Sequence, residues 1–206
     1  MHSNLKKKIL ILGGSSDIAK ELINNIDLDK YNLFLHYNKN KPKIKKKKIN
    51  LIKKDFSLLN KKSEKKKLED FKSFDVIINL IGYIDNKSYF ESNYDNLIKS
   101  LNANFLAPLL IIKNSINHMK KRKFGRIINC SSIGTKFGGG KNTFNYSLSK
   151  YCSEFIPQEL RKITNKNILI NNIKMGVVNT KIHQKIPKKM IKKRIKLIPA
   201  KRMGKA

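Results

Sequence analysis

The chain has 206 residues, with 46 Lys and Arg against 14 Asp and Glu, so its formal net charge is +32. A hydrophobic content of 40% excludes a wholly disordered chain, and the length suffices for one domain with a substantial core. The longest strongly apolar run, 105–112, is too short to cross a bilayer, and the run 9–12 is too short for a secretory signal. Since Cys130 and Cys152 form neither a disulfide framework nor a metal-binding spacing, we expect a cytoplasmic protein without a metal.

The basic composition raises a nucleic-acid partner as one hypothesis. Lysine accounts for nearly all of the charge, with 41 lysines against 5 arginines, whereas evolved readers of phosphates and bases favour arginine. Lys, Ile and Asn, all encoded by A/T-rich codons, make up 94 of the 206 residues, so we interpret the charge mainly as base composition expressed on solvated faces. We therefore expect no specific nucleic-acid partner. Residues 181–206, with 11 basic residues and no acid, are the one segment where the charge calls for interpretation.

Short apolar runs typical of strands alternate with helical patterns along the chain. The expected strands are 8–12, 33–37, 49–52, 76–81, 126–130 and 168–173. The expected helices are 18–26, 58–71, 97–119 with Pro108 inside it, and 145–163 with a kink at Pro157. A basic loop, 39–48, follows the second strand. Continuous apolar strands alternating with helices predict a parallel α/β sheet covered on both faces, and the absence of linkers and repeats predicts a single domain over 1–206.

The first expected strand runs into a loop rich in glycine and serine and then into a helix. The loop residues are Gly13, Gly14, Ser15, Ser16, Asp17 and Ile18. Glycine supplies the backbone freedom that a tight turn needs, and free N–H groups at a helix start suit a pyrophosphate. An ordinary glycine turn with Ser16 or Asp17 as helix cap is the alternative interpretation of this motif alone.

A second motif places Tyr146 and Lys150 at i and i+4, on one face of an expected helix. A free tyrosine has a pKa of about 10, and a nearby ammonium lowers it by favouring the phenolate. The pair therefore suits proton transfer to or from an alcohol oxygen. Because Tyr-x-x-x-Lys is a common pattern, its surroundings decide its meaning.

Those surroundings resemble the short-chain dehydrogenase/reductase family, in particular its 3-oxoacyl-acyl-carrier-protein reductase-like members. The loop is similar to T-G-x-x-x-G-I-G in its G-x-S-S-x-I-G form, with Leu12, Asp17 and Ala19 departing from the pattern. Residues 125–132 resemble G-R-I-V-N-x-S-S and end in Ser132. Further similarities, in the family's order, are 79–82 to N-N-A-G, Asn104 to the helix asparagine, 175–180 to P-G-x-x-x-T with Met175 for Pro, and 199–204 to P-x-x-R-x-G.

The resemblance implies a Rossmann-type doubly wound parallel sheet and an oxidoreductase that interconverts a carbonyl and a secondary alcohol. It implies that Tyr146 is the general acid or base, that Lys150 lowers its pKa and holds the nicotinamide ribose, and that Ser132 polarises the substrate carbonyl. It also implies that Asn104 supports a water that relays protons to Lys150. The cofactor supplies the hydride, and the protein supplies orientation and charge.

The end of the second strand favours NADP(H) over NAD(H). An acidic residue there would bind the adenosine ribose of NAD(H), but this chain has Asn38 and Lys39, which can accept a 2′-phosphate. The residues that the resemblance assigns to the cofactor are Gly13, Ser15, Ser16, Asp17, Ile18, Asn38, Lys39, Asp55, Phe56, Asn79, Gly82, Tyr146, Lys150, Gly176, Val178 and Thr180.

The family pattern continues beyond the segment 199–204 with a helix and a final strand. We therefore expect the sheet to lack its last family strand and a homo-oligomer interface to be incomplete. The substrate stays open between a 3-oxoacyl thioester, whose acidic carrier protein would meet the basic segment 181–206, and a sugar or polyol. A non-catalytic cofactor-binding protein of the same fold is the alternative function.

Overall fold

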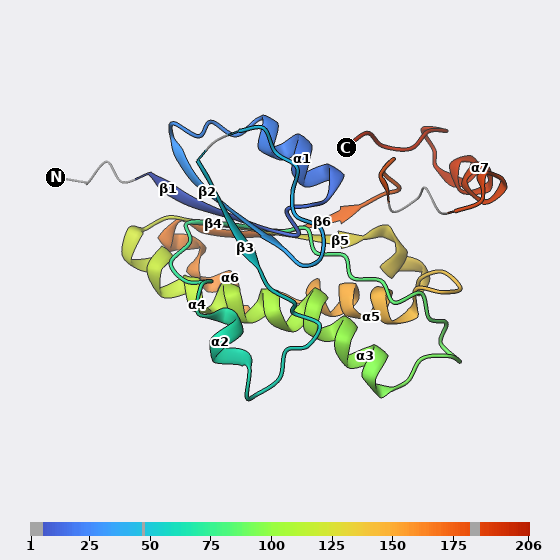
Figure 1. Ribbon diagram of the computed structural model, residues 1–206, viewed down its shortest axis with the longest axis horizontal. Helices are drawn as coiled ribbons and strands as arrows, with labels where there is room; N and C mark the ends of the chain where they lie inside the picture. The colour runs from blue at the N-terminus through green and yellow to red at the C-terminus, as the bar shows by residue number, and fades with distance from the viewer. Residues whose placement is uncertain (1–5, 47, 182–185) are drawn as a thin grey trace.

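The computed structural model describes residues 6–46, 48–181 and 186–206. Six parallel strands form one sheet in the order β3-β2-β1-β4-β5-β6 (Figure 1). The strands are β1 Lys7–Leu12, β2 Tyr31–Tyr37, β3 Ile49–Lys53, β4 Val76–Asn79, β5 Gly125–Ser132 and β6 Ile168–Met175. This is the strand order of a doubly wound dinucleotide-binding fold, so the predicted Rossmann-type α/β class is confirmed.

The central strand β1 is buried along its last four residues, because both faces of the sheet are covered there. Leu10 and Leu12 face a large core with Ile77 and Ile111. Alternate residues of β1 and β2 instead face α1 in a second, smaller core. The expectation of a doubly covered sheet therefore holds over the central strands.

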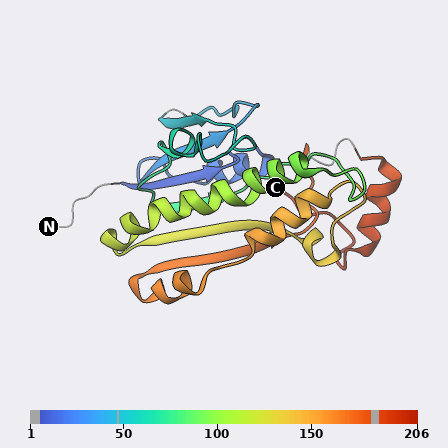
Figure 2. The same ribbon diagram turned by 90° about the horizontal axis from the view of Figure 1, so that it is seen from below.

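The helices lie on the two faces of the sheet unequally. α1 (Asp17–Asn24) lies on one face, while the other face carries the remaining helices of the sheet region (Figures 1 and 2). These are α2 Glu64–Leu68, α3 Tyr94–Leu101, α4 Ala107–Arg122, α5 Phe144–Ser153 and α6 Gln158–Arg161. α7 (Lys188–Leu197) lies apart from both layers, beyond the carboxyl ends of the strands.

Three predicted helices are shorter or more broken than the sequence pattern indicated. The helix expected over 58–71 is regular only in α2, Glu64–Leu68. The helix expected over 145–163 ends at Ser153, because Pro157 has no N–H to continue it and instead precedes α6; a 3-10 turn, Lys162–Lys166, follows. The expected kink is therefore a break.

The long helix expected over 97–119 is divided by a π-helical turn, Asn102–Leu106, between α3 and α4. Pro108 lies in the first turn of α4 and cannot donate to the carbonyl of Asn104, as residue i+4 of an α-helix would. The backbone widens at this point, and π-turns of this kind are frequent at functional sites.

The basic loop expected over 39–48 is anchored on α1, although Lys47 lies outside the described residues. The Lys46 ammonium donates to three main-chain oxygens at the end of that helix, with the shortest contact at 2.9 Å to Ile26. A cation here stabilises the negative end of the helix dipole. Within the described ranges, no helix is both long and apolar enough to span a membrane.

Candidate functional site

The phosphate loop is wedged between β2 and β4 at the carboxyl end of β1. Gly13 has φ +79°, and a Cβ atom there would lie 2.9 Å from the carbonyl oxygen of Leu80. The Gly14 N–H donates to the main-chain oxygen of His36 at 2.7 Å. Since only glycine tolerates both the positive φ and the close approach, Gly13 is fixed by the backbone geometry. β1 and β4 also flank the point where strand order reverses, which is where ligands bind in such sheets.

The loop ends in the helix cap that the sequence left open between two residues. Ser16 is the cap of α1, since its hydroxyl accepts a hydrogen bond from the Ala19 N–H at 3.1 Å. Asp17 follows in the first turn of the helix, and Ser15 is exposed. The free N–H groups of this turn and the positive end of the helix dipole face the loop.

Asp17 joins the phosphate loop to the segment that follows β6. Its carboxylate accepts the main-chain N–H of Lys181 at 2.8 Å and forms an ion pair with the Lys181 ammonium at 3.6 Å. Thr180, which the resemblance assigns to the cofactor, is the neighbour of Lys181. The structure thus brings together two segments that the resemblance assigns to the cofactor and that lie more than 160 residues apart in the chain.

The segment after β6 is closed by a short parallel bridge between Val178 and Gly204. The Gly204 N–H donates to the oxygen of Val177, and the Asn179 N–H donates to the oxygen of Gly204, both at 2.9 Å. This explains why the 199–204 motif belongs with 175–180: the chain returns from α7 to the same place. Gly176 is exposed here.

The ends of β2 and β3 bring together the residues expected to hold the adenosine. Asn38 is half-buried and Lys39 exposed, and Asn38 hydrogen-bonds to the carboxylate of Asp55. Burial acts to raise the pKa of Asp55, but hydrogen bonds from Ser57 and Asn38 hold it below its ordinary value. Asp55 is therefore ionised at neutral pH and orients Asn38.

His36 links these segments behind the surface, a role that the sequence analysis missed. Its ring stacks on Phe56 with centroids 4.3 Å apart, and its Nε2 lies 3.0 Å from the main-chain oxygen of Lys54. A longer contact, 3.4 Å, joins the Gly13 N–H to Nδ1. Burial lowers the pKa of His36 to about 4, so the ring is neutral, and these partners place its proton on Nε2.

The two predicted residues at the end of β4 differ in their access to a ligand. Asn79 is 1% exposed, and its side-chain oxygen accepts the Ile81 N–H at 3.2 Å, so it shapes the loop rather than lining an open surface. Gly82 is exposed, and a Cβ atom there would lie 3.9 Å from Cε2 of Tyr146. The structure therefore places Gly82 beside the Tyr146 ring.

Ser132 and Tyr146 come together through a side-chain hydrogen bond between the end of β5 and the start of α5. Burial raises the pKa of Tyr146 above its ordinary value, and the hydrogen bond from Ser132 opposes that rise. Lys150 was expected to lower this pKa. In this structure the pKa of Tyr146 is instead shifted by burial, Ser132 and Cys130, and the net direction is upward. The Lys150 ammonium donates to the main-chain oxygen of Cys130 at 2.6 Å.

The Lys150 side chain is itself strongly perturbed. It is 3% exposed, and burial lowers its pKa to about 8, while the neighbouring Cys130 acts in the opposite direction. A lysine with such a pKa is divided between its charged and neutral forms within the physiological range. Perturbed groups of this kind concentrate at functional sites.

Asn104 is fully buried in the π-turn and is engaged on every side. Its Oδ1 accepts the Tyr83 N–H at 2.8 Å, and its Nδ2 donates to the Tyr83 oxygen and to the Ser149 hydroxyl, both at 2.9 Å. The side chain therefore fixes the loop after β4 against α5. Within the described residues its side chain forms no hydrogen bond with Lys150, so any hydrogen-bonded link to that lysine runs through another group.

Several supporting residues had no marker in the sequence. Ser149 lies between the Tyr-Lys pair and bonds Asn104, and Asn145 precedes Tyr146 and donates to Asp85 at 2.6 Å. Glu154 accepts hydrogen bonds from Ser131 and Thr135. Their positions next to Tyr146, Ser132 and Lys150 were the only available hint.

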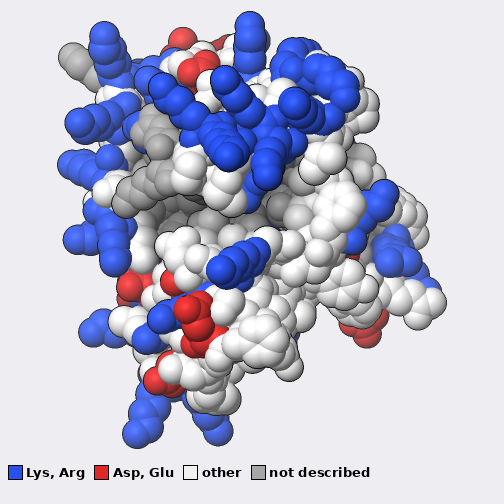
Figure 3. All heavy atoms as spheres, turned by 90° about the vertical axis from the view of Figure 1, so that its right-hand side faces the viewer, with Lys and Arg blue, Asp and Glu red and all other residues white. Residues whose placement is uncertain are grey.

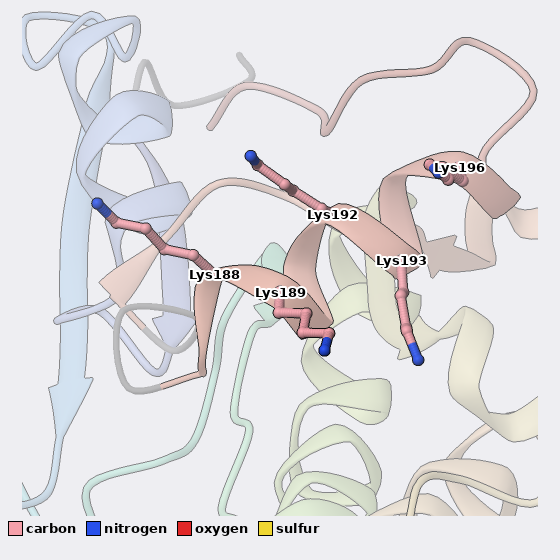
Figure 4. Close-up of a pocket in the computed structure, with 5 residues that line it drawn as sticks. All are labelled: Lys188, Lys189, Lys192, Lys193 and Lys196. Carbon is pink, nitrogen blue, oxygen red and sulfur yellow. The ribbon is translucent and has the colours of Figure 1, made fainter.

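These elements meet at one edge of the molecule, the edge at which all six strands end. Figure 3 shows this edge as a hollow with Lys and Arg side chains gathered above it. α7 contributes five exposed lysines, and their side chains project from the helix in Figure 4. Residues 182–185, part of the basic segment singled out from the sequence, lie outside the described residues.

Comparison with known proteins points to the same family as the sequence motifs. Residues 7–191 match the model of a protein family described as "short chain dehydrogenase". The chain belongs to the short chain dehydrogenase family. The chain is 25% identical over 155 residues to the 3-oxoacyl-[acyl-carrier-protein] reductase FabG of Aquifex aeolicus, covering 73% of this chain and 62% of that protein. It is 31% identical over 140 residues to FabG of Buchnera aphidicola subsp. Schizaphis graminum, covering 65% and 55%.

The chain thus spans somewhat more than half the length of these relatives. Among solved structures, a 3-oxoacyl (acyl-carrier-protein) reductase from Agrobacterium tumefaciens with NADP bound has a TM-score of 0.77 at 16% identity, covering 97% of this chain and 82% of that one. The TT0495 protein of Thermus thermophilus has a TM-score of 0.79 at 17% identity, covering 98% and 86%. At these identities the likeness establishes the fold.

Proposed function

We propose that the protein is an NADP(H)-dependent oxidoreductase that interconverts a carbonyl group and a secondary alcohol. The observation that carries this proposal is the hydrogen-bonded pair of Ser132 and Tyr146, with the buried Lys150 one helical turn further on. The pair lies at the carboxyl edge of the sheet, where the phosphate loop also ends. Family membership and the names of the relatives agree with this reaction class.

The residues at the ends of β1 and β2 fit a dinucleotide with a 2′-phosphate. Gly13 lets the loop turn tightly against the backbone that follows β4, and the free N–H groups at the start of α1 suit a pyrophosphate. Asn38 and Lys39 replace the acid that would select an unphosphorylated ribose. The Agrobacterium relative is described with NADP bound. When bound, NADP(H) supplies or accepts the hydride.

The chain's own residues would manage the proton and the carbonyl oxygen. Tyr146 would donate its phenolic proton to the developing alkoxide in reduction and take it back in oxidation. Ser132 would hold the same oxygen by a hydrogen bond and fix its position. Lys150, already poised between its charged and neutral forms, would supply positive charge near the phenol and pass protons on.

Asn104 would support that proton path indirectly. Its side chain is committed to Tyr83 and Ser149, which leaves its main-chain carbonyl as the atom to hold a water. Pro108 cannot occupy that carbonyl as a helical donor. We therefore assign the relay role of Asn104 to its main-chain carbonyl.

For the substrate, a 3-oxoacyl thioester delivered by an acidic carrier is the first candidate. The relatives' names include such a reductase, and the lysines of α7 present a basic face at the edge of the site. A sugar or polyol is the second candidate, since the base-composition account of the lysines removes the reason to prefer the carrier.

A non-catalytic NADP-binding protein is the alternative from another class. The hydrogen bond from Lys150 to Cys130 and the raised pKa of Tyr146 favour it, because both describe a site that is not set for proton transfer. Oxidation of NADPH, followed optically against a panel of ketones, ketosugars and 3-oxoacyl thioesters, separates the two. Turnover of any member supports the enzyme, and cofactor binding without turnover across the panel supports the alternative.

A further inference from the structure

Glu154 lies at the end of α5, the helix that carries Tyr146 and Lys150. Its Oε1 accepts hydrogen bonds from the Ser131 hydroxyl at 2.5 Å and the Thr135 hydroxyl at 2.8 Å. Its Oε2 forms an ion pair with Lys174 of β6 at 3.1 Å. One carboxylate thus joins α5, the end of β5, the turn that follows β5, and β6.

The same contacts lead directly to Ser132. The Thr135 hydroxyl lies 2.8 Å from the main-chain oxygen of Ser132 as well as 2.8 Å from the Glu154 carboxylate. It can donate its proton to either oxygen. The Ser132 hydroxyl accepts the Gly134 N–H at 3.1 Å, which orients that hydroxyl within the turn. The turn that positions Ser132 is therefore attached to α5 through Glu154.

We propose that Glu154 is a positioning residue that holds the Ser132 hydroxyl against Tyr146 by tying the turn after β5 to the end of α5. In the described structure its carboxylate forms no hydrogen bond with Ser132 or Tyr146. Its effect is transmitted by Ser131 and Thr135. The role rests on the proposed function only in its consequence for turnover, since the clamp itself is a property of the ligand-free protein.

The charge of Glu154 makes the clamp effective. Burial acts to raise its pKa, but the hydrogen bonds from Ser131 and Thr135 and the Lys174 ammonium hold it below its ordinary value. The group is therefore ionised at neutral pH, and hydrogen bonds to an ionised acceptor are roughly twice as strong as neutral ones. A half-buried carboxylate with three donors also has little freedom to leave its place.

The clamp predicts a measurable change in the ionisation of Tyr146. Ser132 opposes the rise of the Tyr146 pKa, so loosening Ser132 should allow that pKa to rise by about one unit, the value of one hydrogen bond to a charged group. The other titratable group that acts on the pKa of Tyr146, Cys130 of β5, is left unchanged, and so is Lys150 on the same helix.

The test uses the full chain labelled with ¹³C at the tyrosine ring, without cofactor. The Tyr146 resonance is assigned by its loss in Tyr146→Phe, and its ionised fraction is compared at one alkaline pH at which circular dichroism shows every variant folded. Glu154→Leu and Thr135→Val should lower that fraction, as Ser132→Ala should. Glu154→Gln, which keeps one oxygen for Ser131 and Thr135, should give an intermediate value.

Glu159→Leu is the matched control, since it removes one exposed acid from the adjacent α6. It should leave the ionised fraction unchanged. If Glu154→Leu does not fold, Thr135→Val decides, because it removes one arm of the clamp with almost no change in side-chain volume. An unchanged Tyr146 ionisation in the folded variants, or an equal shift in Glu159→Leu, overturns the proposal.

Kinetics give a second readout once a substrate is known. Glu154→Leu should lower kcat by about tenfold to a hundredfold, since misplacing a catalytic group by a fraction of an ångström to one ångström has effects of this size. The KM for NADPH should stay within about twofold, as the clamp does not contact the phosphate loop. A wild-type chain that never oxidises NADPH refutes the proposed function, whereas the tyrosine measurement still decides the clamp.

Discussion

The Nζ atom of Lys150 lies 2.6 Å from the main-chain oxygen of Cys130, so α5 is attached to β5 by a buried ammonium. Burial lowers the pKa of Lys150 to about 8, against 10.5 in its ordinary state. The folded protein therefore binds fewer protons than the unfolded chain between these two values. Stability rises with pH over that window, and the full cost of the buried charge is present below pH 8.

Lys150→Met should accordingly stabilise the protein at pH 7 by up to about 3 kcal/mol while abolishing turnover. The hydrogen bond to Cys130 that the variant loses offsets part of this gain. The difference between variant and wild type should shrink as pH rises toward 10. Chemical unfolding at pH 7 and pH 10 checks it, and a methionine variant that is less stable than the wild type at pH 7 would show that the ammonium is a net stabiliser.

His36 should make the protein sensitive to acid. Burial lowers its folded pKa to about 4, against 6.5 in the unfolded chain, so the stability that depends on neutral His36 is complete above pH 6.5 and is lost as pH falls toward 4. The size of the effect is about 3 kcal/mol. His36→Asn should flatten the pH dependence of the free energy of unfolding in this window. Equal slopes for His36→Asn and wild type would contradict the prediction.

Lys39 should select the phosphorylated cofactor. Removing its charge with Lys39→Ala should raise the Kd for NADP⁺ by about tenfold or more, the value of a charge-assisted hydrogen bond, and change the Kd for NAD⁺ by less than about twofold. Lys41→Ala removes an exposed lysine from the same loop and should have little effect on either. Calorimetric titration of the wild type and both variants with NADP⁺ and NAD⁺ measures all six constants. Equal or tighter binding of NAD⁺ by the wild type would refute the NADP(H) assignment.

Asp75 should stabilise the sheet at the edge opposite the site. It is 1% exposed, accepts the Lys8 N–H at 2.8 Å, forms an ion pair with Arg122 at 2.8 Å and hydrogen-bonds to the His118 ring at 3.2 Å. Asp75→Ala leaves partly exposed donors without their acceptor, so it should cost about 1–3 kcal/mol in the free energy of unfolding. NADP⁺ affinity at low temperature should be unchanged. A loss below about 1 kcal/mol would show that water replaces the carboxylate.

The sequence predicted the central strands β1 and β4 well because each contains a continuous apolar run, as a doubly covered sheet requires. It predicted the helices less well where one residue changes the backbone. Pro157 ends α5 instead of bending it, and the widened turn at Asn104 leaves no mark in hydrophobic periodicity.

The sequence could mark candidate site residues that belong to motifs, because a motif has fixed spacing. It could not mark the supporting residues, because their contacts exist only in the folded chain. Ser132, Tyr146 and Lys150 stand at fixed spacing, and the structure brings Ser132 and Tyr146 into contact. Glu154 acts through contacts to residues 23 and 19 positions earlier in the chain, which only the folded structure brings together. The direction of the Lys150 ammonium likewise depends on packing against Cys130.

The most direct test of the account is Tyr146→Phe, which removes one hydroxyl from the centre of the site. NADPH oxidation should fall at least about a thousandfold with every carbonyl that the wild type reduces, because the phenol supplies the transferred proton. NADP⁺ should still bind within about threefold of the wild-type Kd, since the phosphate loop and the end of β2 are untouched. A Tyr146→Phe variant that keeps full turnover would contradict the central claim.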